Sequence, residues 1–199
     1  MTTLADIRTR LRKDLHDTDA AAYRWTDAQL DRHIDRGLGE VSQAVPLEKT
    51  ATIATTNGSR DLAVASLTGL LDIEAAEFPV GDYPPTYVPY SRWATTVTLH
   101  VDAVPTGQNA KLYYTARHTL DGAGTTLPAE LEDVVATGAA AFAAIELANY
   151  RIDQLNSGGD EVSERYASWG RGWLMAYREL LRLHARRARV RPRRLYVPA

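Results

Sequence analysis

Apolar residues recur every three or four positions in two segments near the start of the chain, which is the spacing of amphipathic helices. The first segment predicts a helix over residues 3–16. The second predicts a helix from Thr26, which has Gln29 three residues later as in a capping box, to just before Pro46. The apolar positions are Leu4, Ile7, Leu11 and Leu15 in the first helix, and Leu30, Ile34, Leu38, Val41 and Val45 in the second.

The pattern changes at Thr50, where threonine and valine become frequent in place of leucine and arginine. Residues 93–101 alternate between apolar and other positions, which predicts one strand with one buried face; after a turn, residues 111–117 predict a second strand. Asn57-Gly58 has the composition of a tight hairpin turn between two short strands. Residues 78–89 are rich in proline, glycine and tyrosine, and we expect them to form an irregular connection between the predicted hairpins.

Helical spacing returns in the last third of the chain. Pro128, with acidic residues close behind it, marks the start of a helix that is expected to run to Leu155. Its small-sided segment from Gly138 to Ala141 allows a neighbouring backbone to approach closely. After a glycine-rich stop at residues 156–159, a final helix carries a stripe that is expected to pack along the preceding helix. The stripe consists of Val162, Tyr166, Trp169, Trp173, Tyr177, Leu180 and His184.

These elements predict an α+β protein that is mainly helical, with a four-helix body, an inserted β-module and an extended C-terminal arm. A chain of 199 residues supplies one sizeable core, so the β-module is interpreted as an insertion into one body. The expected parts are an N-terminal helical pair (residues 1–49), a β insertion (50–120), a helical hairpin that completes the helical body (121–187) and an extended basic C-terminal arm (188–199).

The net charge of −2 conceals a division of charge along the chain. Residues 178–199 contain eight arginines and one acidic residue, which leaves a net charge of −9 on residues 1–177. A basic tail on an acidic body favours an acidic partner or a phosphate backbone for the tail alone. The sequence has no cysteine, no signal-like start and no apolar run near the ~20 residues that span a bilayer, so we expect a cytoplasmic product without a membrane partner.

Candidate sites for catalysis or metal binding are few. Asp17 begins a calcium-like loop that lacks an oxygen ligand and a glycine further on, and residues 122–124 resemble a dinucleotide loop without its third glycine. No nucleophile elbow or phosphate-binding loop occurs. The histidines lack the paired spacing of metal ligands, and we expect surface or edge residues. They are His16, His33, His100, His118 and His184. The prediction is a protein that is not an enzyme, with no catalytic residues, no cofactor and no metal.

Three aspartates, Asp27, Asp31 and Asp35, lie four residues apart and share one face of the second helix. Three interpretations stay open. A solvated face shared with Arg32 and Arg36 ranks first, a charged contact with a neighbouring copy of the chain ranks second, and a metal site ranks last. The three carboxylates therefore form a candidate inter-subunit face.

The C-terminal arm combines arginines with apolar residues. A frayed basic tail is one interpretation, but a merely solvated tail does not need the apolar anchors near its end. Docking of an extended segment onto a protein partner fits the composition better. The candidate docking residues are Arg186, Arg187, Arg189, Val190, Arg191, Arg193, Arg194, Leu195, Tyr196 and Val197.

The layout as a whole resembles the head-to-tail adaptor (connector or head-completion) proteins of tailed bacteriophages. The resemblance covers nearly the full length. The features that carry it are the short helix from Thr3, the helix start at Trp25-Thr26-Asp27, the inserted β-module, the helical hairpin after Leu127-Pro128 and the ending Arg193-Arg194-Leu195-Tyr196. Some members of that family are nearly all helical, so the size of the β insertion is a departure.

This resemblance implies a structural virion protein at the head-to-tail junction, made in the host cytoplasm. It implies a homo-oligomeric ring, twelvefold in that family, which extends the DNA channel below the portal protein and receives a stopper or tail-completion protein. Double-stranded DNA then passes through without sequence-specific binding. Two rival hypotheses are a nucleic-acid-binding regulatory protein that uses the arginine-rich arm, and a small hydrolase whose site has no recognisable motif.

Overall fold

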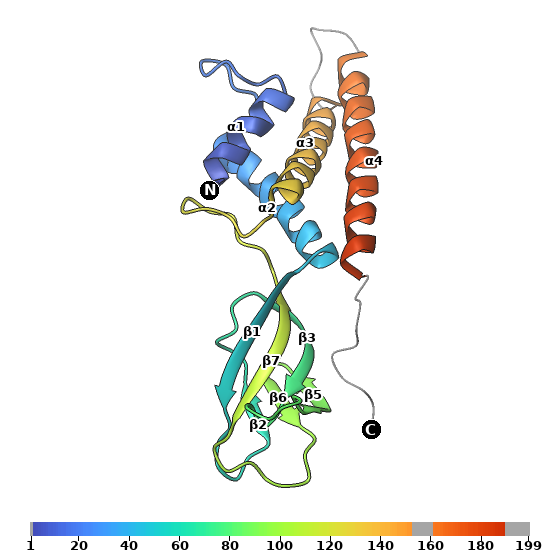
Figure 1. The fold of residues 1–199 in the computed structure, drawn as a ribbon. Coiled ribbons are helices and arrows are strands. Elements are labelled where there is room, and N and C mark those ends of the chain that lie inside the picture. The colour runs from blue at the N-terminus through green and yellow to red at the C-terminus, as the bar shows by residue number, and fades with distance from the viewer. Residues whose placement is uncertain (1, 153–160, 190–199) are drawn as a thin grey trace. The chain divides into compact units, whose positions relative to one another are not determined.

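The chain divides into a helical unit and a strand unit in the computed structural model, which describes residues 2–152 and 161–189 (Figure 1). The helical unit comprises residues 2–45, 118–152 and 161–189, and the strand unit comprises residues 46–117. The strand unit is therefore an insertion between two halves of the helical unit. The predicted class, α+β and mainly helical, is confirmed.

Four helices make up the helical unit: α1 (Leu4–Asp14), α2 (Asp27–Ala44), α3 (Ala129–Ile152) and α4 (Glu161–Arg189). Thr3 and Thr26 cap the first two through reciprocal capping boxes with Asp6 and Gln29. The predicted box at Thr26 is therefore confirmed. The last helix extends beyond the predicted end at residue 187.

The core of the helical unit gathers around α3, whose middle consists of small residues. The ring of Tyr177 from α4 lies over Gly138, where an added Cβ atom would be 2.7 Å from the nearest ring carbon. Gly37 brings α2 close as well, since a Cβ atom there would be 3.1 Å from the Val135 carbonyl oxygen. The small-sided segment thus admits an aromatic ring from α4, and at Ala139 it also allows the predicted close approach of a backbone, that of Gly37 on α2.

The predicted aromatic stripe of α4 faces this core. Tyr177 is fully buried, and Tyr166, Trp169, Trp173 and Leu180 are partly buried against the same cluster. Successive rings contact edge to face, with centroids 6.2 Å apart for Tyr166 and Trp169. Burial of this stripe holds α4 along α3.

Seven strands form two antiparallel sheets in the strand unit. One sheet has the order β1-β7-β3-β4 and the other the order β2-β6-β5. The strands are β1 (Leu47–Ala54), β2 (Asp61–Ala63), β3 (Leu70–Glu77), β4 (Tyr87–Val88), β5 (Tyr90–Trp93), β6 (Thr96–Leu99) and β7 (Asn109–Ala116). The buried face of β7 meets residues of β2 and β6 in one apolar cluster, so the two sheets share a core. Its members include Leu62, Ile73, Val97, Leu99, Leu112 and Tyr114.

Three expectations for this unit are wrong. Asn57-Gly58 does not join a hairpin, because β1 pairs with β7 while β2 pairs with β6. Residues 93–101 do not form one strand, because the chain reverses at Ala94 (φ 50°) and β5 folds back on β6. Trp93 consequently lies at a hairpin tip with 86% of its surface exposed, although the alternation placed it on a buried face. The predicted second strand at residues 111–117 is confirmed as β7, although β6 before the turn belongs to the other sheet.

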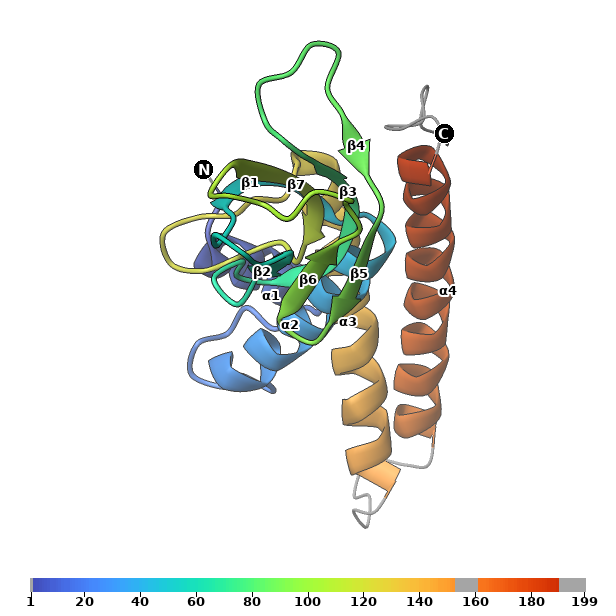
Figure 2. The same ribbon diagram turned by 90° about the horizontal axis from the view of Figure 1, so that it is seen from below.

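The segment of residues 78–89 is irregular as predicted, apart from the two residues of β4. The Phe78 amide donates a hydrogen bond to the Thr86 carbonyl oxygen (2.9 Å), and the Val80 amide donates one to the Asn109 carbonyl oxygen (3.0 Å). These bonds close the base of a loop that projects from the strands of its unit (Figure 2). Tyr83 lies on this loop and is 97% exposed.

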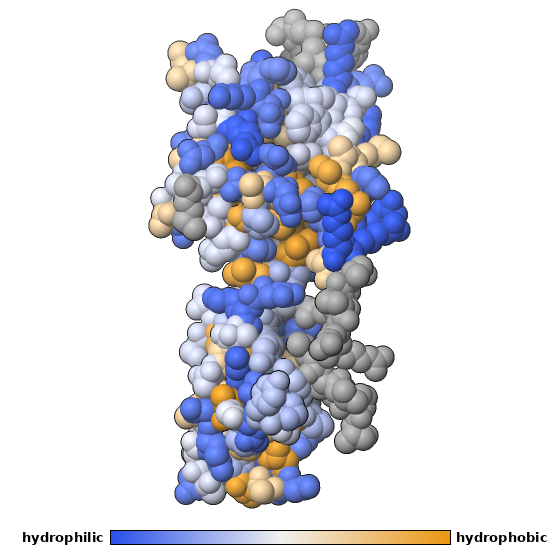
Figure 3. All heavy atoms as spheres, viewed as in Figure 1, coloured by the Kyte–Doolittle hydropathy of each residue, from blue (hydrophilic) through white to orange (hydrophobic). Residues whose placement is uncertain are grey.

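Hydrophilic side chains cover most of the surface on the face drawn in Figure 3, and apolar atoms appear there in small groups between them. Most large apolar side chains of the described residues are buried or partly buried. The exceptions include Tyr83, Trp93, Tyr150 and Met175. Large exposed aromatic residues are candidates for contacts with a partner.

Candidate functional site

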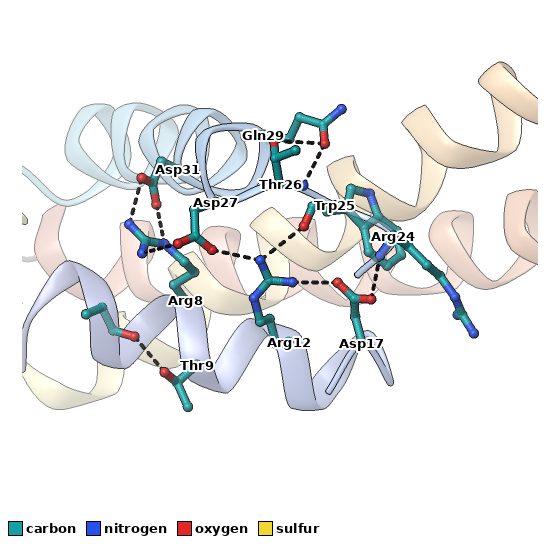
Figure 4. A network of polar contacts seen from close by, with 11 residues as sticks. Arg8, Thr9, Arg12, Asp17, Arg24, Trp25, Thr26, Asp27, Gln29 and Asp31 are labelled. Carbon is teal, nitrogen blue, oxygen red and sulfur yellow. Dashed lines mark hydrogen bonds and ion pairs between the residues drawn. The ribbon is translucent and has the colours of Figure 1, made fainter. Parts of the chain in front are cut away.

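Arg12 on α1 is the centre of a buried polar network (Figure 4). Its guanidinium donates hydrogen bonds to Asp17 (2.6 Å), to Asp27 (2.7 Å) and to the Trp25 carbonyl oxygen (3.0 Å). The Tyr23 ring lies 3.5 Å from the guanidinium carbon, in the geometry of a cation–π contact. One side chain thus joins α1, the loop that follows it and the start of α2.

Arg8 lies one helical turn before Arg12 and extends the same network. It donates two hydrogen bonds to Asp31, both of 2.8 Å, and one of 2.9 Å to Asp27. The bond from Arg12 holds the pKa of Asp27 below its ordinary value, and the bond to Asp31 raises the pKa of Arg8. Both shifts favour the charged forms, so the pairs persist at neutral pH.

The structure corrects the leading interpretation of the three aspartates on α2. Asp27 and Asp31 pair with Arg8 and Arg12 of α1 and not with Arg32 and Arg36 of their own helix. Arg32 contacts Glu146 and Arg36 pairs with Glu40. Asp35 also has an interaction partner. Two of these carboxylates therefore join helices within one chain, and their role as an inter-subunit face stays a prediction.

Asp17 is a further member of the network, and sequence reasoning missed it as a structural group, as it missed Arg8, Arg12 and Arg24. Its second carboxylate oxygen accepts a hydrogen bond from the Arg24 backbone amide (2.8 Å), so the carboxylate closes the loop between α1 and α2. The Arg24 side chain in turn donates to the Tyr166 hydroxyl on α4 (2.7 Å). The available signal was the pair of arginines at positions 8 and 12, which share one face of α1 with four-residue spacing.

Two histidines that were expected at the surface are buried. His118 lies with Nε2 3.1 Å from the Val45 carbonyl oxygen and Nδ1 3.2 Å from the Thr126 hydroxyl. His33 lies 3.0 Å from Glu146. Burial lowers the pKa of both rings below the ordinary value of 6.5, and for His33 the nearby carboxylate opposes the effect. The expectation failed because single histidines carry no periodic signal for burial.

The stability of the helical unit is expected to fall when the pH is lowered through 6.5, the ordinary pKa of histidine. A lowered pKa in the folded state means that the unfolded chain binds more protons between that pKa and 6.5. The stabilising effect of neutral His118 is therefore complete above 6.5 and is lost as the pH falls toward the folded pKa. Urea unfolding followed by circular dichroism measures this change. His118→Gln should reduce the pH dependence, and a dependence equal to that of the natural chain would contradict the assignment.

The predicted docking arm is only partly within the described residues. Arg186, Arg187 and Arg189 lie on α4, so the arm does not begin at residue 186 as an extended segment. Arg186 and Arg187 are exposed on that helix. The remaining candidates lie outside the described residues: Val190, Arg191, Arg193, Arg194, Leu195, Tyr196 and Val197.

Within residues 2–152 and 161–189, no three or more carboxylate, histidine or cysteine side chains are grouped so that they could hold a metal ion. None of the helices described there is apolar over a length sufficient to span a bilayer. The buried polar network around Arg12 joins helices and a loop to one another.

Comparison with known families identifies the class of protein. The model of the family described as SU10 adaptor protein matches residues 2–196. The chain therefore belongs to this family of phage head-to-tail adaptors, and its general role is that of an adaptor in a phage particle. A search of curated proteins finds no match to the chain.

Proposed function

We propose that the chain forms a ring under the portal protein, extends the DNA channel and offers a docking surface to a stopper or tail-completion protein. The observation that carries the proposal is the family match, which covers residues 2–196 and so includes both units and most of the arm. Twelve copies per ring follow from the resemblance. The ring acts through its geometry and needs no chemical step.

The charge distribution supports this role. Residues 1–177 carry a net charge of −9, which disfavours tight binding of phosphates along most of the body. A channel through which double-stranded DNA must slide cannot hold its backbone firmly. Arginines concentrate instead on α4 and in the arm, where an acidic protein surface can receive them.

Electron microscopy of the full chain mixed with isolated portal rings tests the proposal. The expected result is an added ring of density on one face of the portal, with a stoichiometry that native mass spectrometry can count. Portal rings that stay unchanged at micromolar excess of the chain contradict the proposal. Binding of duplex DNA without portal, with affinity that falls steeply as salt is added, would favour the rival nucleic-acid-binding regulator.

Removing residues 190–199 is expected to abolish portal binding while the melting temperature changes little. These residues lack the periodic apolar pattern from which the cores are built.

Replacing Arg191, Arg193 and Arg194 by glutamine should slow association with the portal, because steering by charge acts on the encounter rate. Leu195→Ala with Tyr196→Ala should speed dissociation, since loss of a buried aromatic anchor costs on the order of 2 kcal/mol. Binding kinetics on portal rings measure both rates, and full binding by the truncated chain would disprove a docking arm.

A further inference from the structure

A groove in the helical unit lies between the loop after α1 and the first turns of α4. It has a volume of about 360 Å³ and a mostly apolar lining. Its shape is fixed by contacts described above: Arg24 donates to the Tyr166 hydroxyl, and Tyr166 packs edge to face against Trp169. A groove with fixed walls loses little entropy when it receives a side chain. The lining residues are Leu15, His16, Arg24, Arg165, Tyr166 and Trp169.

Two of the lining residues, Arg24 and Arg165, are exposed cationic side chains. Such a groove fits an aromatic or aliphatic side chain that has a carboxylate beside it, because the carboxylate then meets the arginines. An aromatic or aliphatic side chain beside a basic residue is disfavoured, because the two arginines repel that positive charge.

Two exposed aromatic residues of the strand unit have the shape for such a contact, and their neighbours distinguish them. Tyr83 is 97% exposed and follows Asp82, whereas Trp93 is 86% exposed and follows Arg92. The groove is complementary to the first pair and repels the second. The loop that carries Tyr83 is closed at its base by the bonds of Phe78 and Val80, so it presents the ring on an ordered stem.

We propose that Tyr83 of one copy inserts into the groove of the next copy, with Asp82 beside Arg24 and Arg165. The inference rests on the proposed function, because it names the contact that joins neighbouring subunits of the ring. The two surfaces differ, so the contact is heterologous, and repetition of a heterologous contact closes a ring when the rotation per subunit permits. Tyrosine suits the role, since its large amphipathic ring has few rotors to order on binding.

Disulfide trapping tests the contact directly, because the natural chain has no cysteine. The full-length double variant Asp82→Cys with Arg165→Cys keeps the Tyr83 ring; it is concentrated, oxidised mildly and separated on a non-reducing gel. The expected product is a ladder of dimers and larger species, since each copy offers both halves of the contact. Arg92→Cys with Arg165→Cys is the matched control, because Arg92 precedes the other exposed aromatic residue, Trp93. A ladder no stronger than this control, or a disulfide within single chains, overturns the proposal.

A charge exchange gives a second measurement that does not depend on cysteine geometry. Asp82→Arg should reduce ring assembly on portal by about tenfold or more, because like charges then face each other. Addition of Arg165→Asp to that variant should restore part of the assembly, and absence of any restoration counts against the pairing. If the unmodified chain assembles on portal but the double-cysteine variant gives no disulfide ladder, this contact alone is disproved. Absence of any added ring would instead disprove the proposed function.

Discussion

Replacement of Arg12 by alanine is expected to lower the free energy of unfolding of the helical unit by about 3–5 kcal/mol. The reason is the environment of its partner: Asp17 is 3% exposed, and without the guanidinium it becomes a buried charge with no counter-ion. The Trp25 carbonyl oxygen loses its donor as well. Urea unfolding followed by circular dichroism at a helical wavelength measures the change.

Arg8→Ala is the matched control, since this arginine lies on the same helix and also pairs with two aspartates. Its partners are more exposed than Asp17, so the expected cost is about 1 kcal/mol or less. A further variant, Arg12→Met with Asp17→Asn, removes both charges and keeps an acceptor for the Arg24 amide. It should recover most of the loss. Equal destabilisation by Arg8→Ala and Arg12→Ala would contradict a special role for the buried pair.

Gly138→Ala is expected to destabilise the helical unit by about 1–2 kcal/mol, although alanine is the better helix former. The added methyl group would lie within 3.0 Å of three atoms of the Tyr177 ring. That ring is fully buried, packs edge to face on Phe142 at 5.8 Å and has its hydroxyl 3.4 Å from the Gly37 carbonyl oxygen. It therefore has little freedom to move aside.

Gly172 on α4 provides the comparison, because a Cβ atom there meets nothing within 4 Å. Gly172→Ala should stabilise the protein by about 0.5–1 kcal/mol through helix propensity alone. The two glycine variants are thus expected to shift the unfolding midpoint in opposite directions. If both raise it, the close approach of Tyr177 to α3 is wrong.

The helices could be predicted from the sequence because their signals are local. The capping box at Thr26 and the stop before Pro46 lie within a few residues of the helix ends that they set. The stripe of α4 could be predicted in the same way, since residues three and four apart on a helix share a face. Tyr177 is the one fully buried residue among the side chains of that stripe from Tyr166 to His184, because Gly138 leaves space for its ring.

The strand pairing could not be predicted because partners in a sheet are set by contacts distant in sequence. Alternation over residues 93–101 is the same whether the chain continues straight or folds back at Ala94. Asn57-Gly58 has the composition of a hairpin turn, yet the strands before and after it belong to different sheets. Local composition predicts that a turn forms and leaves open which strands it joins.

The polar network of the helical unit also could not be predicted from the periodicity of the sequence. Arg12 lies beside the apolar stripe of α1, where an arginine is normally solvated. Its burial depends on the return of the chain through Trp25 and Asp27, which brings a carbonyl oxygen and a carboxylate to the same place. Such convergence is a tertiary property, and its local signs are limited to the four-residue spacing of Arg8 and Arg12 beside the apolar stripe.

The pairing of Leu47 with Ala116 holds the first and last strands of the insertion together at the point where the chain leaves and re-enters the helical unit. On the helical side, His118 lies in hydrogen-bonding distance of Val45 and its amide bonds to the Ser42 hydroxyl, so the two ends of the gap are joined there too. The two ends of the insertion are therefore close together whatever its length. A longer or shorter insertion changes the entropy cost of closing the loop only slightly. We therefore expect the helical unit to tolerate insertions of different size at this point without a change in helix packing.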